Sequence, residues 1–342
     1  MMTRRSLICA ALCASTPLIR AAFADDSLTQ WQQWQRFYVS SGRVIDAQQG
    51  GISHSEGQGY GLLLAQAHGD RQAFDEIDAW TRQHIAIRDD RLMAWKWQPG
   101  PGNNIADWHN ATDGDLFRAW ALLRAGRDSG WAGCAENAVQ IARDIANLCM
   151  APDPRAESEH LLLPGAEARR FADRVLINPS YFMSRALREL GVAAGEPRLI
   201  KAADHGETVL TELASMEFLP NWIDVTPDGF ASPMEHDLRW GYDALRIPLY
   251  LVWSGHSDHE AVRVADKYMN LGTTRDHVVV EATPQGAVLV ESDRAGFQAV
   301  RDLTNGDLSI LRALTGEDYY SDTLLMMARL ARRESQGISP LR

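Results

Sequence analysis

Helical patterns of apolar residues follow one another along almost the whole chain, with no low-complexity linker between them. The expected helices span residues 27–40, 56–68, 71–86, 112–126, 134–150, 179–191, 197–215, 241–253, 258–270, 293–302, 306–314 and 318–334. Such sequential pairs favour either an open α-solenoid or a closed toroid of helical hairpins, and no signature of a known solenoid repeat is visible. Two β-like stretches interrupt the helices: a hairpin at 277–292 and a short strand within 91–104.

The first 24 residues have the features of an export signal. Arg4 and Arg5 precede an apolar run at residues 7–12, and Ala22-Phe23-Ala24 resembles a cleavage site. The apolar run is too short to span a bilayer, so we expect cleavage after Ala24 and no membrane insertion of the mature chain. The paired arginines leave a twin-arginine route open. Residues 25–342 are then expected to form one domain of a periplasmic or secreted protein.

The charge of the chain narrows the choice of partners. Removing residues 1–24 takes away three arginines and no acids, which changes the formal net charge from −11 to −14. A protein this acidic is a poor electrostatic match for nucleic acid or for anionic lipid. We therefore expect no nucleic-acid partner and favour a neutral substrate.

The cysteines indicate neither a disulfide nor a metal site. Cys134 and Cys149 remain after signal removal, and both fall in the expected helix 134–150. Fifteen residues of helix span about 22 Å, which is beyond the reach of a disulfide. We expect two buried thiols. No CxxC, HExxH or other ligand spacing is present, so the sequence implies no metal and no cofactor.

The stretch "GGISHSEGQGYGLLLAQAHGD" (50–70) places Glu56 and three glycines at the start of one expected helix. Each glycine costs about 1 kcal/mol relative to alanine inside a helix. Glycines at this position allow a neighbouring inner helix or a ligand to approach the backbone closely. Taken alone, the position of Glu56 favours a first-turn acid stabilised by the helix dipole, with Ser53 or Ser55 as the N-cap, over a catalytic residue.

Three further helix starts carry polar residues ahead of nearly all-apolar bodies. The first has two acids around a glycine, the second has an acid with an arginine one turn later that can pair with it, and the third follows a proline. These residues are Asp113 and Asp115, then Asp243 and Arg246, then Asn178, Ser180 and Tyr181. Four such helix starts are difficult to explain by capping alone.

These runs resemble the motifs of glycoside hydrolase family 8, in the order of that family. They are "SEGQGYG" (55–61), "NATDGDL" (110–116), "NPSYF" (178–182) and "YDALRIPLY" (242–250). The resemblance extends from about Trp31 to the last expected helix. It is strongest to the periplasmic endo-1,4-β-glucanases that accompany bacterial cellulose synthase. It implies an all-α (α/α)6 barrel with short β-hairpin insertions, inverting hydrolysis, and a possible association with the cellulose synthase machinery.

The resemblance also implies a role for each matched residue. Glu56 corresponds to the general acid, and Asp243 corresponds to the general base. Asp113 corresponds to the aspartate that binds the distorted sugar, and Tyr181 to the tyrosine that helps to hold the attacking water. Arg246 corresponds to the arginine that keeps the base ionised.

Supporting and substrate-binding residues are expected beside these five. We expect Asp115 to be structural, and we place Tyr60 and Asn110 of the same motifs among the substrate-binding residues.

The two acids need opposite protonation states. A helix N-terminus favours the ionised form of Glu56, and so does not suit a general acid. We expect burial and the negative charge of Asp113 to raise the pKa of Glu56, and Arg246 to lower the pKa of Asp243.

Tryptophans suggest the type of substrate. The chain has 11 of them, and we expect Trp95, Trp97 and Trp108 to line the cleft. Pyranose rings stack on indoles, which suits an extended, uncharged β-1,4-glucan such as cellulose.

Several alternatives remain at this point. Xylanase, lichenase and chitosanase activities occur with the same catalytic acids in the same family. A polysaccharide lyase would need a cluster of basic residues to neutralise a uronate, whereas the quoted motifs are acid-rich. A non-catalytic glycan-binding protein would not need Asp243 and Arg246 paired opposite Glu56.

Overall fold

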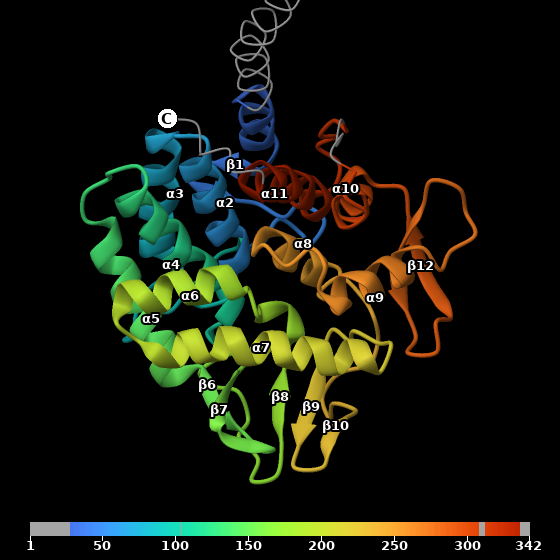
Figure 1. Ribbon diagram of the computed structural model, residues 1–342. Helices are drawn as coiled ribbons and strands as arrows, with labels where there is room; N and C mark the ends of the chain where they lie inside the picture. The colour runs from blue at the N-terminus through green and yellow to red at the C-terminus, as the bar shows by residue number, and fades with distance from the viewer. Residues whose placement is uncertain (1–27, 103, 308–311, 336–342) are drawn as a thin grey trace, which may run out of the picture.

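The helices form sequential pairs, as the sequence patterns predict (Figure 1). The computed structural model describes residues 28–102, 104–307 and 312–335. A first helix covers described residues 28–38. The helices that follow are α2 (Ser55–Ala67), α3 (Arg71–His84), α4 (Thr112–Arg127), α5 (Cys134–Leu148), the 3₁₀ turn η1 (Pro179–Tyr181), α6 (Ser184–Ala194), α7 (Pro197–Ser215), α8 (Arg246–Trp253), α9 (Glu260–Met269), α10 (Ala295–Thr304) and α11 (Tyr319–Ser335).

Alternate helices form an inner ring. Helices α2, α4, α6 and α8 pack side by side in this order, and α3, α5, α7 and α9 each pack against the inner helix that precedes them. Helix α11 packs against α10, α8 and α2, so the ring closes. The arrangement is the expected (α/α)6 barrel, and closure rules out the open solenoid.

The sequence composition of each helix explains its layer. Every residue of α2 except Glu56 is buried, and all eight residues of α8 are buried. An inner helix is surrounded by others, so it is apolar on most sides. The outer helix α3 buries only one stripe of its surface, formed by Ala73, Phe74, Ile77, Trp80 and Thr81.

Two glycines let the first inner helices meet at backbone distance. A Cβ atom on Gly59 would lie 3.0 Å from the carbonyl oxygen of Gly114. A Cβ atom on Gly114 would lie 2.3 Å from Ser55 Oγ and 2.7 Å from the backbone nitrogen of Glu56. Of the two explanations for the glycine-rich helix start, the structure supports close packing against a neighbouring inner helix.

The C-terminal helix is tied to the ring by one buried carboxylate. Glu334 accepts hydrogen bonds from Arg124 of α4, from Arg185 of α6 at 2.7 Å and from the indole of Trp253 of α8 at 2.8 Å. Its side chain is only 4% exposed. Charge-assisted contacts of this kind favour one arrangement of the four helices.

Short antiparallel strands occupy the connections between helices. Figure 1 shows β6–β10 gathered along one edge of the ring and the β11–β12 hairpin projecting from another. The strands are β1 (Val39–Ser40), β2 (Arg43–Val44), β3 (Ser53–His54), β4 (Lys96–Trp97), β5 (Ile105–Asp107), β6 (Met150–Asp153), β7 (Ala156–Leu162), β8 (Val175–Ile177), β9 (Ile223–Thr226), β10 (Gly229–Ala231), β11 (Val278–Ala282) and β12 (Val288–Ser292). The expected hairpin at 277–292 and the strand within 91–104 are confirmed.

Three expected helices differ from the structure. The segment expected at 179–191 is split into η1 and α6, and α8 begins at Arg246 rather than at residue 241. The helix expected at 306–314 falls partly on residues 308–311, which lie outside the described residues, and its described remainder is not helical. Residues 1–24, interpreted as a signal, also lie outside the described residues.

We expect Gly114→Ala to destabilise the fold by about 1–3 kcal/mol, since the added methyl group overlaps the start of α2. Urea unfolding measures this difference. Gly100→Ala is the control, because a Cβ there meets no atom within 4 Å. Equal stabilities of the two variants would contradict the close approach of α2 and α4.

Candidate active site

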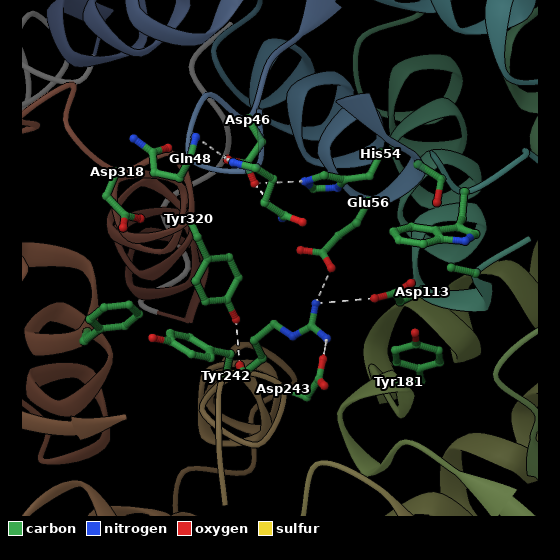
Figure 2. Close-up of a pocket in the computed structure, with 16 residues that line it drawn as sticks. Asp46, Gln48, His54, Glu56, Asp113, Tyr181, Tyr242, Asp243, Asp318 and Tyr320 are labelled. Atoms are coloured by element: carbon green, nitrogen blue, oxygen red, sulfur yellow. Dashed lines mark hydrogen bonds and ion pairs between the residues drawn. The ribbon is translucent and has the colours of Figure 1, made fainter. Parts of the chain in front are cut away.

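Four helix starts converge on one cleft of about 530 Å³. Glu56 lies in the first turn of α2, Asp113 in the first turn of α4 and Tyr181 in η1. Asp243 lies in the turn just before α8 rather than inside the helix. Figure 2 shows these side chains directed into the same space. The structure thus brings together residues that are nearly two hundred positions apart.

Arg246 is the centre of the cleft. Its Nη1 lies 2.5 Å from Glu56 Oε2 and 3.3 Å from Asp113 Oδ2, and its Nη2 lies 2.5 Å from Asp243 Oδ1. Nη2 also donates to the hydroxyl of Ser180 at 3.0 Å. The guanidinium is only 2% exposed, so these contacts take place largely away from water. The predicted pairing of Arg246 with Asp243 is confirmed, and one cation joins all three acids.

The distribution of protons between Glu56 and Asp113 is the reverse of the one expected. Burial raises the pKa of Asp113 to about 8, and the nearby charge of Glu56 adds to this rise. Burial also raises the pKa of Glu56, but the charge of Arg246, the charge that His54 carries when it is protonated, and a hydrogen bond from Arg246 bring it below its usual value. The cause is the shorter contact that Arg246 makes with Glu56. Of the two carboxyl groups, Asp113 is therefore the one that favours the protonated form.

The expectation for Asp243 also needs correction. Arg246 does lower the pKa of this carboxyl, as expected, but burial is the larger effect and the charge of Glu56 adds to it. The net pKa of Asp243 is therefore raised.

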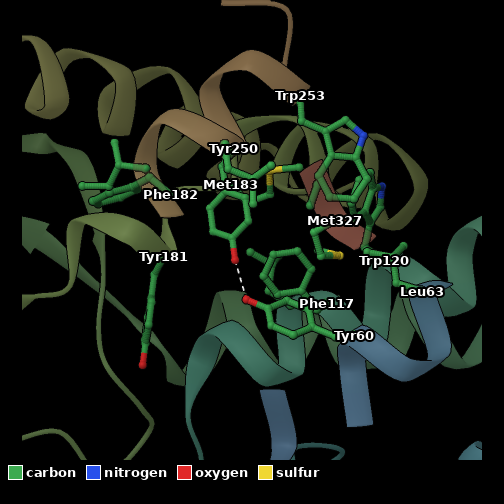
Figure 3. Close-up of a cluster of buried hydrophobic side chains, with 14 of the residues drawn as sticks. Tyr60, Leu63, Phe117, Trp120, Tyr181, Phe182, Met183, Tyr250, Trp253 and Met327 are labelled. Carbon is green, nitrogen blue, oxygen red and sulfur yellow. Dashed lines mark hydrogen bonds between the residues drawn. The ribbon is translucent and has the colours of Figure 1, made fainter. Parts of the chain in front are cut away.

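Tyr60 lies beneath the cleft rather than on its surface. It is only 1% exposed, and its hydroxyl contacts the hydroxyl of Tyr250 and Arg246 Nη1. Figure 3 shows the two tyrosines within the aromatic cluster that includes Phe117. Tyr60 therefore supports Arg246 from below, in a position that does not suit the substrate contact expected for it.

Asn110 and Asp115 form a buried support under the start of α4. Asn110 donates to Asp115 at 2.9 Å and accepts from the backbone nitrogen of Ala166 at 2.6 Å, so its amide is occupied. Asp115 also accepts from the backbone nitrogen of Met93 at 2.8 Å, and burial raises its pKa to about 7. The structural role expected for Asp115 fits this position, whereas the position of Asn110 does not suit substrate contact.

Of the three tryptophans expected in the cleft, only Trp95 is among the residues that line it. Trp97 is partly buried against Trp80, with the guanidinium of Arg43 4.3 Å from its ring. Trp108 is 48% exposed but does not line the cleft.

The cleft also contains residues that the motifs did not identify. Tyr242, Phe297 and Tyr320 form an aromatic wall, and the hydroxyl of Tyr320 donates to the carbonyl of Tyr242 at 2.7 Å. Tyr242 is the first residue of the motif that contains Asp243, although the motif alone assigns it no role. Asp46 and His54 lie near Glu56 in Figure 2.

Tyr181 is nearly buried, at 7% exposure, and packs edge-on against Trp222. Figure 2 shows its hydroxyl directed into the cleft on the side of Asp113. An oxygen at this place can contact a water molecule or a sugar hydroxyl.

Among the described residues, no group of three or more His, Cys, Asp or Glu side chains is arranged so that it could hold a metal ion. Cys134 and Cys149 are free and buried, as expected. Across the described part of the chain, none of the helices combines the length and hydropathy needed to cross a bilayer.

The fold and the site together indicate the class of the protein. Several acids around one cleft of a helical barrel are suited to hydrolysis of a glycosidic bond. The model of the family "Glycosyl hydrolases family 8" matches residues 6–334. The chain belongs to this family and is a glycoside hydrolase.

Relatives and solved structures agree with this assignment. The chain is 31% identical to a probable endoglucanase of Novacetimonas hansenii, covering 92% of this chain and 94% of the relative. It is 31% identical to an endoglucanase of Cellulomonas uda, covering 92% and 87%. The endoglucanase Cel10 from Klebsiella pneumoniae superposes with a TM-score of 0.82 at 30% identity, covering 90% and 99%. The endo-β-1,4-glucanase CMCax from Acetobacter xylinum gives 0.79 at 29% identity, covering 92% and 99%.

The raised pKa of Asp113 predicts a specific dependence of stability on pH. Between the ordinary aspartate pKa of about 3.9 and about 8, the native protein holds a proton that the unfolded chain releases. The contribution of Asp113 to the free energy of unfolding is therefore fully present at low pH. It decreases as the pH rises through this window, by up to about 1.4 kcal/mol per pH unit.

Asp113→Asn removes this contribution, so we expect its free energy of unfolding to vary less steeply with pH than that of the wild type. Urea unfolding at several pH values measures both slopes. Asp115 contributes equally to both proteins and cancels in the comparison. Parallel curves would show that Asp113 does not hold the proton.

Proposed function

We propose that the protein is an endo-1,4-β-glucanase that hydrolyses internal β-1,4 linkages of cellulose or a related β-glucan with inversion. The observation that carries this proposal is the joint contact of Arg246 with Glu56 and Asp243, at 2.5 Å each, across one cleft. Inverting hydrolysis uses two carboxyl groups about 6.5–9.5 Å apart, one for the leaving oxygen and one for a water molecule.

Each residue then has a distinct part in the reaction. Glu56 gives its proton to the leaving glycosidic oxygen, and Asp243 accepts a proton from the attacking water. Tyr181 helps to hold that water, and Asp113 binds hydroxyls of the sugar at the cleavage point. An ionised Asp113 can accept hydrogen bonds from those hydroxyls with both of its oxygens.

Substrate entry supplies the change of protonation that the reaction needs. In the ligand-free cleft Arg246 favours ionised Glu56, which cannot act as an acid. A sugar that separates Glu56 from Arg246 removes this charge, and the burial that remains raises the pKa of Glu56. Transfer of the Asp113 proton to Glu56 then leaves the acid protonated without uptake from solvent.

A neutral glucan fits the composition of the cleft. The lining has several carboxyl groups and one arginine, so it lacks the basic cluster that a lyase needs for a uronate. Trp95 and the aromatic wall offer faces for pyranose rings. The named relatives are endoglucanases, which favours a glucan over xylan or chitosan.

The place and task of the enzyme belong to the same proposal. We propose that residues 1–24 direct export, and that the mature enzyme works in the periplasm or outside the cell. An association with bacterial cellulose biosynthesis is suggested by the motif resemblance.

We expect Glu56→Gln to lower the kcat for carboxymethyl-cellulose by about 10²–10⁴-fold, because the amide cannot donate an acidic proton. Binding of cello-oligosaccharides should persist. Glu136→Gln is the matched control, since Glu136 is an exposed glutamate in the first turn of α5.

Two outcomes would contradict the proposal. NMR of the first product should show the anomer inverted relative to the β-linkage, so a β-anomer would exclude this mechanism. Faster hydrolysis of xylan, lichenan or chitosan than of cellulose would assign another substrate.

A further inference from the structure

His54 caps the helix that carries Glu56. Its Nδ1 accepts a hydrogen bond from the backbone nitrogen of Gly57 at 3.0 Å, and α2 begins at the next residue, Ser55. The serines expected to cap this helix do not do so: Ser53 donates to the carbonyl of Val44 and accepts from Arg43 instead. The first turn of α2 therefore depends on an imidazole.

This hydrogen bond specifies the protonation state of the ring. A nitrogen that accepts from a backbone N–H carries no proton, so Nδ1 of His54 is bare. The proton of the neutral ring is then on Nε2, which lies 3.7 Å from Asp46 Oδ2. A second proton on Nδ1 would face the N–H of Gly57, and the cap would be lost.

Asp46 is itself held in place. It accepts hydrogen bonds from the backbone nitrogens of Gln48 and Gln49 at 3.1 and 3.2 Å, and from the side chain of Gln49 at 2.8 Å. Burial raises the pKa of Asp46, but the interaction with His54 and the hydrogen bonds from Gln49 outweigh this effect, so the carboxyl stays ionised. Asp46 is thus a fixed carboxylate on the Nε2 side of the ring, 3.7 Å away.

We propose that His54 is a positioning residue for Glu56: its neutral Nε2–H form fixes the first turn of α2 and adds no second positive charge beside the acid. The inference rests on the proposed function only in taking Glu56 as the general acid. A protonated ring would have two effects that both oppose catalysis. It would release the Gly57 N–H, and its charge would favour the ionised form of Glu56.

Other groups also face this ring. Asp46 and Glu56 are the nearest acids, Lys96 is the strand partner of His54 across β3 and β4, and Tyr319 of α11 packs edge-on against the imidazole. Asp318, at the end of the loop before α11, lines the same cleft. Substitution of His54 alone leaves all of these in place, so a change in kcat is attributable to the ring.

NMR of protein labelled with ¹⁵N-histidine tests the ring directly, with the His54 signal assigned by its loss in His54→Asn. We expect the Nε2–H tautomer at the pH of maximal activity, with Nδ1 unprotonated. A cationic ring, or a proton on Nδ1, would overturn the proposal. This measurement does not use activity, so it stands even if Glu56→Gln proves active and the proposed function fails.

Activity profiles test the consequence for Glu56. We expect His54→Ala to lower kcat by at least about tenfold, with little change in KM, because small displacements of a catalytic group are costly. His54→Asn should recover kcat to within about threefold of the wild type, since asparagine is a good N-cap.

His259 provides a matched control. It caps the outer helix α9 in the same way, with Nδ1 accepting from the backbone nitrogen of Ala261 at 3.1 Å. His259→Ala should lower thermal stability but leave kcat unaltered, and His259→Asn should lose less stability, since asparagine is a good N-cap. If His54→Asn were as inactive as His54→Ala, the positioning role would be refuted.

Discussion

One buried guanidinium sets the geometry of the cleft. Arg246 is 2% exposed and contacts carboxyl groups from three separate parts of the barrel. A buried charge without partners costs several kcal/mol, so Arg246 requires all of these segments to be in place at once. The closed ring of helices and the arrangement of the acids around Arg246 therefore depend on each other.

The packing around Arg246 holds Glu56 and Asp113 at different distances from its guanidinium. Gly59 and Gly114 bring α2 and α4 to backbone contact, which places Glu56 and Asp113 on the same nitrogen of Arg246. The difference between 2.5 and 3.3 Å then favours charge on Glu56 and the proton on Asp113. The cleft thus favours the proton on Asp113 rather than on Glu56, the proposed acid, and the proposed mechanism assigns its transfer to substrate entry.

Much of the fold could be predicted because it depends on local patterns. Apolar helix bodies, loops between them and polar residues at four helix starts are all visible in the sequence, and so is the pairing of Arg246 with Asp243 three positions earlier. The contact of Arg246 with Glu56 joins residues 190 positions apart, and no local pattern reports it.

The predictions that the structure contradicts concern properties that depend on contacts between residues distant in the sequence. The pKa values of Glu56 and Asp243 depend on tertiary distances, and the depth of Tyr60 depends on how α2 packs against α8. The sequence favours a serine as the N-cap because serine is the common choice, whereas the structure uses His54. Residue types indicated which groups form the cleft, but only the packing of the ring determines which of them is charged.

A crystal structure of the Asp243→Asn variant with a cello-oligosaccharide tests the central claim most directly. The account predicts that the sugar separates Glu56 from Arg246, that the glycosidic oxygen lies within hydrogen-bond distance of Glu56, and that a water molecule lies between residue 243 and Tyr181. An intact contact between Arg246 and Glu56, with the sugar bound elsewhere, would contradict it.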